Sequence, residues 1–310
     1  MAAKPRIGCI GLGKMGRPMV SRLAQAGYSL TLMDSDRKLA KQLGQEIGAD
    51  FIASGKTLAS QSEVIITILP NSQIVQTVLQ GPDGVLAGLQ PGTIVIDMTS
   101  GVPSMTQTLA KEVEKAGGVL VDAPVSGGVP RATTGELAIM FGGPEPILEL
   151  IRPVLACMGN SIDRIGEIGS AHAMKALNNL VSAGGFLIGI EALMIGKRFG
   201  LSPDKMVDVL NASTGMNNST QKKFKQYVLS GKYNSGFGLD LMVKDISIAL
   251  GLAQDTQTPA AFSALCQQMW AASAQMQGPG QDHTAVARLV QTLANDSIEN
   301  LTDNAKIQAP

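Results

Sequence analysis

Short apolar runs alternate with segments of helical periodicity along the first half of the chain. The run Ile7–Ile10 has no polar side chain at any position, which is typical of a strand covered on both faces. The strand candidates are Ile7–Ile10, Ser29–Met33, Val64–Leu69, Thr93–Asp97, Val119–Val121 and Ala138–Phe141. The helix candidates between them are Met15–Ala26, Arg37–Gly44, Ser72–Leu79, Ser104–Ala116 and Pro144–Cys157. This alternation predicts an α/β domain with a doubly wound parallel sheet.

The pattern changes near residue 165, after which only helical periodicity remains. Residues 170–199 predict one long helix, in which Gly184, Gly185 and Gly189 lie among small residues and indicate close packing. About 28 residues of helix span roughly 42 Å, enough to join two domains. The further helix candidates are Ser202–Ser213, Gln221–Leu229, Leu239–Ala253, Ala260–Met276 and Thr284–Ala294. We expect an α/β domain over residues 1–165, an all-helical domain over 166–296 and a C-terminal tail over 297–310.

The composition is that of a globular protein with a large buried core. Of the 310 residues, 45% are hydrophobic and 16% are charged, so disorder is not expected. The 25 basic and 25 acidic residues cancel, and aromatic residues make up only 4%. No apolar run reaches the roughly 20 residues that a membrane span needs. We therefore expect neither a nucleic acid nor a membrane among the partners.

The three cysteines, Cys9, Cys157 and Cys266, lie far apart in the sequence. Metal sites need ligands at short, repeated spacings, and the two histidines have no carboxylate cluster near them, so no metal is expected. Only five residues precede Arg6, where the first strand-like run begins, which leaves no room for a targeting peptide. Few cysteines and no targeting peptide favour a cytoplasmic location.

A glycine-rich segment lies between the first strand candidate and the first helix candidate. Residues 11–16 read Gly-Leu-Gly-Lys-Met-Gly, the G-x-G-x-x-G spacing of dinucleotide-binding turns. The first glycine allows a tight turn, the second lets the backbone approach a pyrophosphate, and the third allows the helix to pack closely on the strand. The helix N-terminus then offers N–H groups to the phosphates. The predicted cofactor-binding residues are Gly11, Leu12, Gly13, Met15 and Gly16.

An acidic residue about 20 positions beyond such a turn binds the adenosine ribose in many of these domains. Asp34 ends the second strand candidate and fits this role. Its negative charge repels the 2′-phosphate of NADP, so NAD is the predicted cofactor. Arg37 and Lys38 lie close by and keep NADP possible.

Two segments could carry the chemistry. Ser126, Gly127 and Gly128 follow a strand end, and their N–H groups suit a nest for a carboxylate, although a flexible turn has the same composition. Further along, Lys175 and Asn179 are four residues apart and share one helix face. Partial burial of Lys175 would lower its pKa toward the range that suits proton transfer, whereas a lysine with its amine in solvent is the alternative.

These segments, together with residues 237–245, resemble the 3-hydroxyisobutyrate dehydrogenase family, also called the β-hydroxyacid dehydrogenases. The resemblance runs from about Ile7 to Ala294, and the motifs come in the family's order. It implies an N-terminal Rossmann domain, a long interdomain helix and an all-α C-terminal domain. The implied activity is hydride transfer between NAD(P) and the hydroxyl, or the aldehyde, of a small 3-hydroxy acid.

The resemblance also assigns roles to residues at matching positions. Lys175 is similar to the family's catalytic acid/base, with Asn179 beside it. Ser126, Gly127 and Gly128 correspond to a loop that binds the substrate carboxylate. The implied cofactor contacts near the nicotinamide are Leu69, Pro70 and Thr99, with Lys244 as a cofactor or substrate contact, and Phe237 and Asp245 as substrate-pocket residues. Ala171 departs from the family, which usually has glycine four residues before the lysine.

Several alternatives remain open from the sequence. Imine reductases share this architecture but usually carry another residue at the position of Lys175. A non-catalytic dinucleotide-sensing module on the same fold is the alternative outside the enzymes. His172 lies three residues before Lys175, where it could tune proton transfer or have a structural or solvent-facing role. The long apolar helix predicts a homodimer or homotetramer, and the substrate and the physiological direction stay open.

Overall fold

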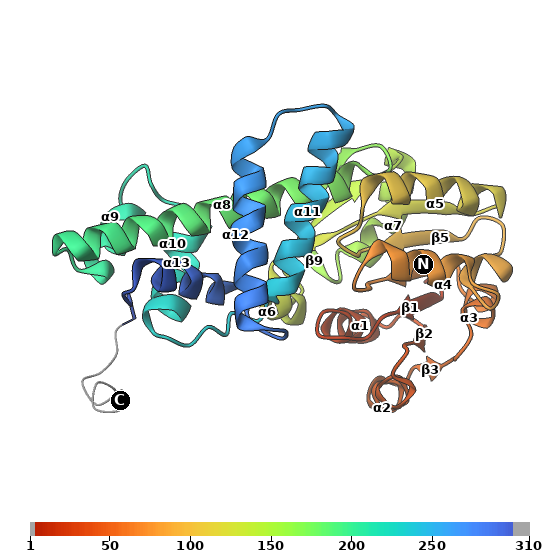
Figure 1. The fold of residues 1–310 in the computed structure, drawn as a ribbon. Coiled ribbons are helices and arrows are strands. Elements are labelled where there is room, and N and C mark those ends of the chain that lie inside the picture. The colour runs from red at the N-terminus through yellow and green to blue at the C-terminus, as the bar shows by residue number, and fades with distance from the viewer. Residues whose placement is uncertain (1–3, 300–310) are drawn as a thin grey trace. The chain divides into compact units, whose positions relative to one another are not determined.

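The structure is a computed structural model that describes residues 4–299. The chain divides into two compact units, Met1–Lys175 and Ala176–Pro310 (Figure 1). The division falls inside one long helix, ten residues beyond the domain boundary that the sequence suggests at residue 165.

The first unit contains a nine-stranded sheet with the order β3-β2-β1-β4-β5-β6-β8-β7, and β9 pairs with β8. Every neighbouring pair from β3 to β6 is parallel, whereas β8 runs antiparallel to β6 and β7. The strands are β1 (Ile7–Ile10), β2 (Leu30–Met33), β3 (Asp50–Phe51), β4 (Val64–Thr67), β5 (Ile94–Asp97), β6 (Val119–Asp122), β7 (Val125–Ser126), β8 (Leu137–Gly142) and β9 (Gly159–Gly166). The predicted doubly wound α/β domain is confirmed.

Alternate side chains of the central strands enter two separate cores, because successive residues of a strand point to opposite faces. On β4, Val64 and Ile66 join one core and Ile65 joins the other. The first core is covered by α1 (Gly16–Gln25), α2 (Arg37–Ile47), α6 (Gly128–Thr134) and α7 (Glu145–Leu155). The second is covered by α3 (Gly55–Gln61), α4 (Ser72–Gln80), η1 (Val85–Ala87) and α5 (Pro103–Lys115). Covering on both faces explains why the central strands are apolar over most of their length.

The second unit is helical over its described residues. Its elements are the larger part of α8 (Ser170–Phe199), then α9 (Pro203–Asn211), α10 (Asn218–Lys222), η2 (Phe224–Leu229), α11 (Leu239–Asp255), α12 (Ala261–Gln277), η3 (His283–Val286) and α13 (Ala287–Ala294). Phe186 of α8 is at the centre of its core and meets the rings of Phe224 and Trp270 edge-on, at centroid distances of 5.3 and 6.0 Å. Such aromatic pairs add to the hydrophobic stabilisation of a core.

Helix α8 continues through its glycines, as the sequence predicts. A side chain at Gly189 would approach the ring of Phe224 to 2.6 Å, so the glycine lets η2 pack closely on the helix. By length and composition alone, α8 is the one helix of the described residues that is apolar enough to cross a membrane. Of its most apolar 18-residue window, 56% is buried in the protein. Its buried side chains Phe186, Ile190 and Leu193 belong to the core of the second unit, so a core helix accounts for this composition.

Three local expectations need correction. Strand β9 was not expected, because it is a strand with mostly polar, partly exposed positions. The predicted helix Gln221–Leu229 is instead α10 followed by the wider turns of η2, because Lys223 leaves the helical conformation with φ −131°. Ile298, placed in the predicted tail over 297–310, is buried in the core of the second unit, and residues 300–310 of that tail lie outside the described residues.

Candidate active site

The glycine-rich turn joins β1 to α1. Gly11 has a φ of +96°, and a side chain there would collide with the Ile68 carbonyl. A side chain at Gly16 would collide with the Gly11 carbonyl, so the chain's own packing requires both glycines. At Gly13, by contrast, an added Cβ would meet no atom of residues 4–299 within 4 Å. The fold itself therefore does not need a glycine at residue 13, whereas the close approach of a pyrophosphate would.

The first turn of α1 suits a pyrophosphate. Met15 occupies the N-cap position without a side-chain hydrogen bond, and no acidic residue lies in the first turn. The N–H groups at the start of α1 thus have no side-chain cap, and phosphates bind to such groups with the favourable end of the helix dipole. The residues present fit a bound dinucleotide.

Asp34 lies directly after β2 and is tied to this turn. Its Oδ2 atom accepts a hydrogen bond from the Leu12 N–H at 2.6 Å, and its Oδ1 atom accepts one from the Asp36 N–H at 2.8 Å. The Ser35 hydroxyl also donates to Oδ1, at 3.3 Å. A carboxylate has about four acceptor positions, so these three bonds leave room for a ribose hydroxyl. Arg37 and Lys38 are exposed at the start of α2.

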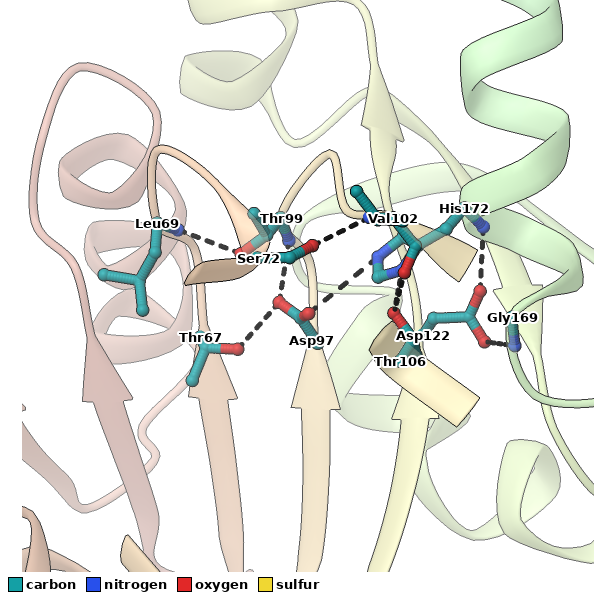
Figure 2. A network of polar contacts seen from close by, with 10 residues as sticks. All are labelled: Thr67, Leu69, Ser72, Asp97, Thr99, Val102, Thr106, Asp122, Gly169 and His172. Atoms are coloured by element: carbon teal, nitrogen blue, oxygen red, sulfur yellow. Dashed lines mark hydrogen bonds and ion pairs between the residues drawn. The ribbon is translucent and has the colours of Figure 1, made fainter. Parts of the chain in front are cut away.

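The loops after β4 and β5 form one hydrogen-bonded unit (Figure 2). The Leu69 N–H donates to Thr99 Oγ1 at 3.1 Å, and the Thr99 N–H donates to Asp97 Oδ1 at 3.1 Å. Thr67 Oγ1 donates to the same carboxylate oxygen at 2.9 Å. The structure thus joins two of the three residues predicted near the nicotinamide, while Pro70 follows Leu69 as an exposed residue.

The predicted carboxylate loop joins β7 to α6. Gly127 and Gly128 have φ values of +133° and +67°, which favour glycine. A side chain at Gly127 would approach Arg131 Cδ to 2.6 Å, so Arg131 of α6 folds back over this loop. The half-buried Ser126 hydroxyl makes no side-chain hydrogen bond within the described part of the chain, which leaves it able to bind a ligand.

Lys175 is the sixth residue of α8, in the second turn of the helix, and is only 8% exposed. The start of this helix is fixed by Asp122, the last residue of β6. Its carboxylate accepts hydrogen bonds from the N–H groups of Gly169 and His172, at 2.7 and 2.8 Å. These N–H groups lie at the start of α8 and have no hydrogen-bond partner within the helix. The side chain of Asp122, at the end of β6, therefore caps the helix.

Burial raises the pKa of Asp122, which is 0% exposed, above its ordinary value of 3.8. The charge of His172 and the hydrogen bonds from Gly169 and His172 act in the opposite direction. Burial thus disfavours the charged form of this carboxyl group, and the hydrogen bonds that it accepts stabilise the charged form.

His172 is buried, 1% exposed, which excludes the solvent-facing alternative. Its Nδ1 atom lies 2.8 Å from Thr106 Oγ1, and its Nε2 atom lies 4.0 Å from Asp97 Oδ2 (Figure 2). Thr106 Oγ1 also donates to the Val102 carbonyl at 3.1 Å. The histidine therefore connects the start of α8 with α5 and with the end of β5.

In the second unit, three of the predicted residues form a chain of contacts. Asn179 is 6% exposed, and its Nδ2 atom donates to Asp245 Oδ2 at 2.5 Å. The other oxygen of Asp245 lies 3.2 Å from Lys244 Nζ. Asp245, itself 1% exposed, thus orients Asn179, which lies one helical turn beyond Lys175 on α8.

Phe237 is held against η3 in the same unit. Its backbone carbonyl accepts a hydrogen bond from the backbone N–H of His283 at 2.8 Å. The two rings pack edge-on with their centroids 5.6 Å apart. Among the described residues, no group of three or more His, Cys, Asp or Glu side chains is arranged to hold a metal ion.

The residues that sequence reasoning missed are the polar ends of buried strands. Thr67, Asp97 and Asp122 are the last residues of β4, β5 and β6, and they are direct neighbours across the sheet. A signal for them existed, because each follows an otherwise apolar run and the carboxyl ends of parallel strands meet at one edge. Nothing local in the sequence indicated that His172 returns to this edge.

Fold and site together define a dinucleotide-binding oxidoreductase with a helical second unit. The family model for the NAD-binding domain of 6-phosphogluconate dehydrogenase matches residues 6–166, and the model for the NAD-binding region of NADP-dependent 3-hydroxyisobutyrate dehydrogenase matches residues 169–290. The chain belongs to the 3-hydroxyisobutyrate dehydrogenase family of NAD(P)-dependent hydroxyacid dehydrogenases.

Individual relatives agree over most of the chain. The 2-(hydroxymethyl)glutarate dehydrogenase of Eubacterium barkeri is 35% identical over 94% of this chain and 97% of its own length. The mitochondrial 3-hydroxyisobutyrate dehydrogenase of Mus musculus is 36% identical over 87% of this chain and 82% of its own. The structure of 3-hydroxyisobutyrate dehydrogenase from Mycobacterium tuberculosis with L-serine has 28% identity and a TM-score of 0.86, covering 93% of this chain and 100% of its own.

The imine reductase alternative has weaker support. An imine reductase from Myxococcus stipitatus with NAD⁺ has a TM-score of 0.64 over 93% of this chain and 100% of its own, but only 18% identity. That likeness shows a shared fold alone.

Proposed function

We propose that this protein oxidises the hydroxyl of a small 3-hydroxy acid, or reduces the corresponding aldehyde, with Lys175 as the acid/base. The burial of Lys175, 8% exposed on a helix whose start is fixed by Asp122, supports this proposal most directly. A buried amine exchanges protons with a bound group rather than with bulk water, and an orienting residue such as Asn179 keeps that group in place.

The proposed steps use few residues of the chain. The substrate carboxylate is bound by the loop of Ser126, Gly127 and Gly128. The hydroxyl on the third carbon of the acid then faces Lys175. The nicotinamide cofactor, when bound, accepts or returns the hydride. Lys175 takes the proton of the hydroxyl as the carbon–hydrogen bond breaks, and it returns the proton when the aldehyde is reduced.

The names of the relatives support this substrate class. 2-(Hydroxymethyl)glutarate and 3-hydroxyisobutyrate both carry a hydroxyl on the carbon next to the one that bears the carboxylate, and they are substrates in the names of two relatives. We propose an acid of this kind, and Arg131, folded over the carboxylate loop, favours one with an additional polar or anionic group.

The test is a spectrophotometric screen of NADH formation with 3-hydroxyisobutyrate, 3-hydroxypropionate, serine, glycerate and 2-(hydroxymethyl)glutarate. With an acid that is turned over, Lys175→Met should lower kcat by about 100-fold or more, because the side chain keeps its length but loses its amine. NADH binding, followed by fluorescence, should persist. Lys111→Ala, which changes an exposed lysine of α5, is the matched control.

A Lys175→Met variant with near-normal kcat would remove the lysine from the mechanism. Silence of the wild type on the whole panel, combined with tight NADH binding, would favour a dinucleotide sensor instead.

We also propose NAD as the preferred cofactor. The carboxylate of Asp34 at the end of β2 supports this, because it accepts ribose hydroxyls and repels a 2′-phosphate. The screen run with both cofactors decides the matter, and a higher kcat/KM with NADP would show that Arg37 and Lys38 outweigh Asp34.

Finally, we propose that copies of the chain associate through the second unit. On α8, Val181, Ile188 and Ile195 recur every seven residues and are 76%, 55% and 71% exposed. Phe262 and Leu265 of α12 are 66% and 59% exposed. An exposed apolar stripe of this kind is typical of a subunit interface.

A further inference from the structure

The ring of His172 is held by features that do not belong to its own helix. Thr106 of α5 binds its Nδ1 atom at 2.8 Å, and the carboxylate of Asp97 lies 4.0 Å from its Nε2 atom. On another side, a Cβ at Gly101 would come within 2.8 Å of the ring atoms Cε1 and Nδ1. The chain thus keeps a glycine where any side chain would displace the imidazole.

The backbone of the same residue is held independently. Asp122 accepts the N–H of His172, and a side chain at Gly142 would come within 2.8 Å of the Asp122 carboxyl carbon. The contacts of the backbone hold the start of α8 on β6, and the contacts of the ring hold the same turn against α5 and β5.

Lys175 is three residues further along α8. In a helix this separation is about 4.5 Å along the axis and about 60° around it, so the two side chains leave neighbouring parts of one face. A rotation of the first turns that moved His172 would move Lys175 with it.

The other end of the network reaches the loops predicted at the nicotinamide. Asp97, which faces the imidazole through Oδ2, accepts the N–H of Thr99 through Oδ1, and Thr99 in turn accepts the N–H of Leu69. We propose that His172 is a positioning residue that sets the amine of Lys175 against these loops. The proposal rests on the proposed role of Lys175 and adds a residue that touches neither substrate nor cofactor.

The cleanest test changes the partner of the histidine rather than α8 itself. Thr106→Val keeps the shape of the side chain but removes the oxygen that binds Nδ1. Thr108→Val is the matched control, because Thr108 makes the same kind of bond to the carbonyl four residues earlier, at 3.0 Å, and is exposed. With an acid that the wild type oxidises, Thr106→Val should lower kcat by about tenfold, since a displacement near 1 Å can cost up to about 100-fold.

Two further readouts separate positioning from stability. The NADH dissociation constant should stay within about twofold of the wild type, because the glycine-rich turn is untouched. With the same acid deuterated at its hydroxyl-bearing carbon, the kinetic isotope effect on kcat should rise in Thr106→Val, because a misplaced amine slows the chemical step. Thr108→Val should change neither quantity.

Replacement of the histidine itself gives a rescue series. His172→Asn keeps a polar atom near the position of Nδ1 and should retain more of kcat than His172→Phe, which keeps a ring without polar atoms. A kcat unchanged in Thr106→Val and equal in the Asn and Phe variants, with only the melting temperature lowered, would reduce the network to a structural one and overturn the proposal.

Crystal structures of wild type and Thr106→Val with NADH give a readout that does not need turnover. The proposal expects the amine of Lys175 to move relative to Leu69 and Thr99 in the variant, and an unmoved amine contradicts it. If the wild type oxidises no acid of the panel, the proposed function fails, while the structures still decide whether His172 positions the lysine.

Discussion

At the scale of single residues, His283 gives the second unit an acid-sensitive point. It is 3% exposed and packs against Phe186, Phe237 and Trp270. Burial, followed by the positive charge of Lys223, lowers the pKa of His283 from 6.5 to about 4, although the neighbouring Asp282 acts in the opposite direction. The folded protein therefore favours the neutral ring.

The sign of the pH dependence follows from this lowered pKa. The stability that neutral His283 contributes is present above pH 6.5 and is lost as the pH falls toward 4. The pKa of Asp282 is itself lowered from 3.8. The stability that its charged form contributes is therefore lost only below pH 4, outside this window.

We predict that His283→Asn, which keeps a polar atom near Nδ1, flattens the fall of unfolding free energy between pH 6.5 and 4. Urea unfolding at several pH values measures it. The loss of ring volume lowers stability at every pH, so the slope is the quantity to compare. Equal slopes in both proteins would assign the acid sensitivity to other groups.

At this scale the sequence indicated Lys175, Asn179 and Asp34, because each lies at a fixed distance from a recognisable motif. It did not indicate the contacts of Asp245 with Asn179, or of His172 with Thr106, which join residues 66 positions apart in both cases. Such pairs depend on how helices return to a site, and periodicity within one segment carries no information about that return.

At the scale of elements, the turn between β1 and α1 contains glycines that are needed for different reasons. Gly16 is small because of the chain's own backbone, whereas a Cβ at Gly13 meets nothing in the described residues within 4 Å. The two positions should therefore respond differently to the same substitution.

We expect Gly13→Ala to fold with a near-normal melting temperature and to bind NADH more weakly, on the order of tenfold, because its methyl group meets the pyrophosphate. Gly16→Ala should instead lose about 1–3 kcal/mol of stability through overpacking. Gly251→Ala on α11 is the control, since a Cβ there meets nothing within 4 Å. Thermal unfolding and NADH fluorescence measure both effects, and unchanged NADH affinity in Gly13→Ala would separate this turn from the cofactor.

Most elements could be predicted from the sequence, because their apolar periods were regular and their ends carried glycine, proline or polar caps. The exceptions have physical reasons. Strands β3 and β7 are two residues long, and β9 has few buried positions, so none has a clear period. Helices α3 and α6, which were also not predicted, are only seven residues long. The break at Lys223 and the close packing of Phe224 on Gly189 are tertiary features, which no propensity of residues 224–229 records.

At the scale of the whole molecule, the second unit exposes apolar side chains that a single chain does not bury. We predict that the 32.3 kDa chain elutes as a dimer or larger assembly in size-exclusion chromatography with light scattering. Ile188→Glu should shift it toward the monomer, because a charge at an apolar interface is unpaired. Leu150→Glu is the matched control, since Leu150 is 68% exposed on α7 of the first unit. A monomeric wild type would contradict the proposed association.

The division of the chain inside α8 has a consequence for recombining this enzyme with its relatives. Asp122 and Thr106, which hold the first turns of that helix, come from the α/β half, whereas the later turns pack among helices. In a chimera joined at residue 166, the start of α8 would come from the relative, whereas Asp122 and Thr106 would come from this protein. The crossover should fall after Lys175, so that the lysine comes from the same parent as Asp122 and Thr106, which hold the start of its helix.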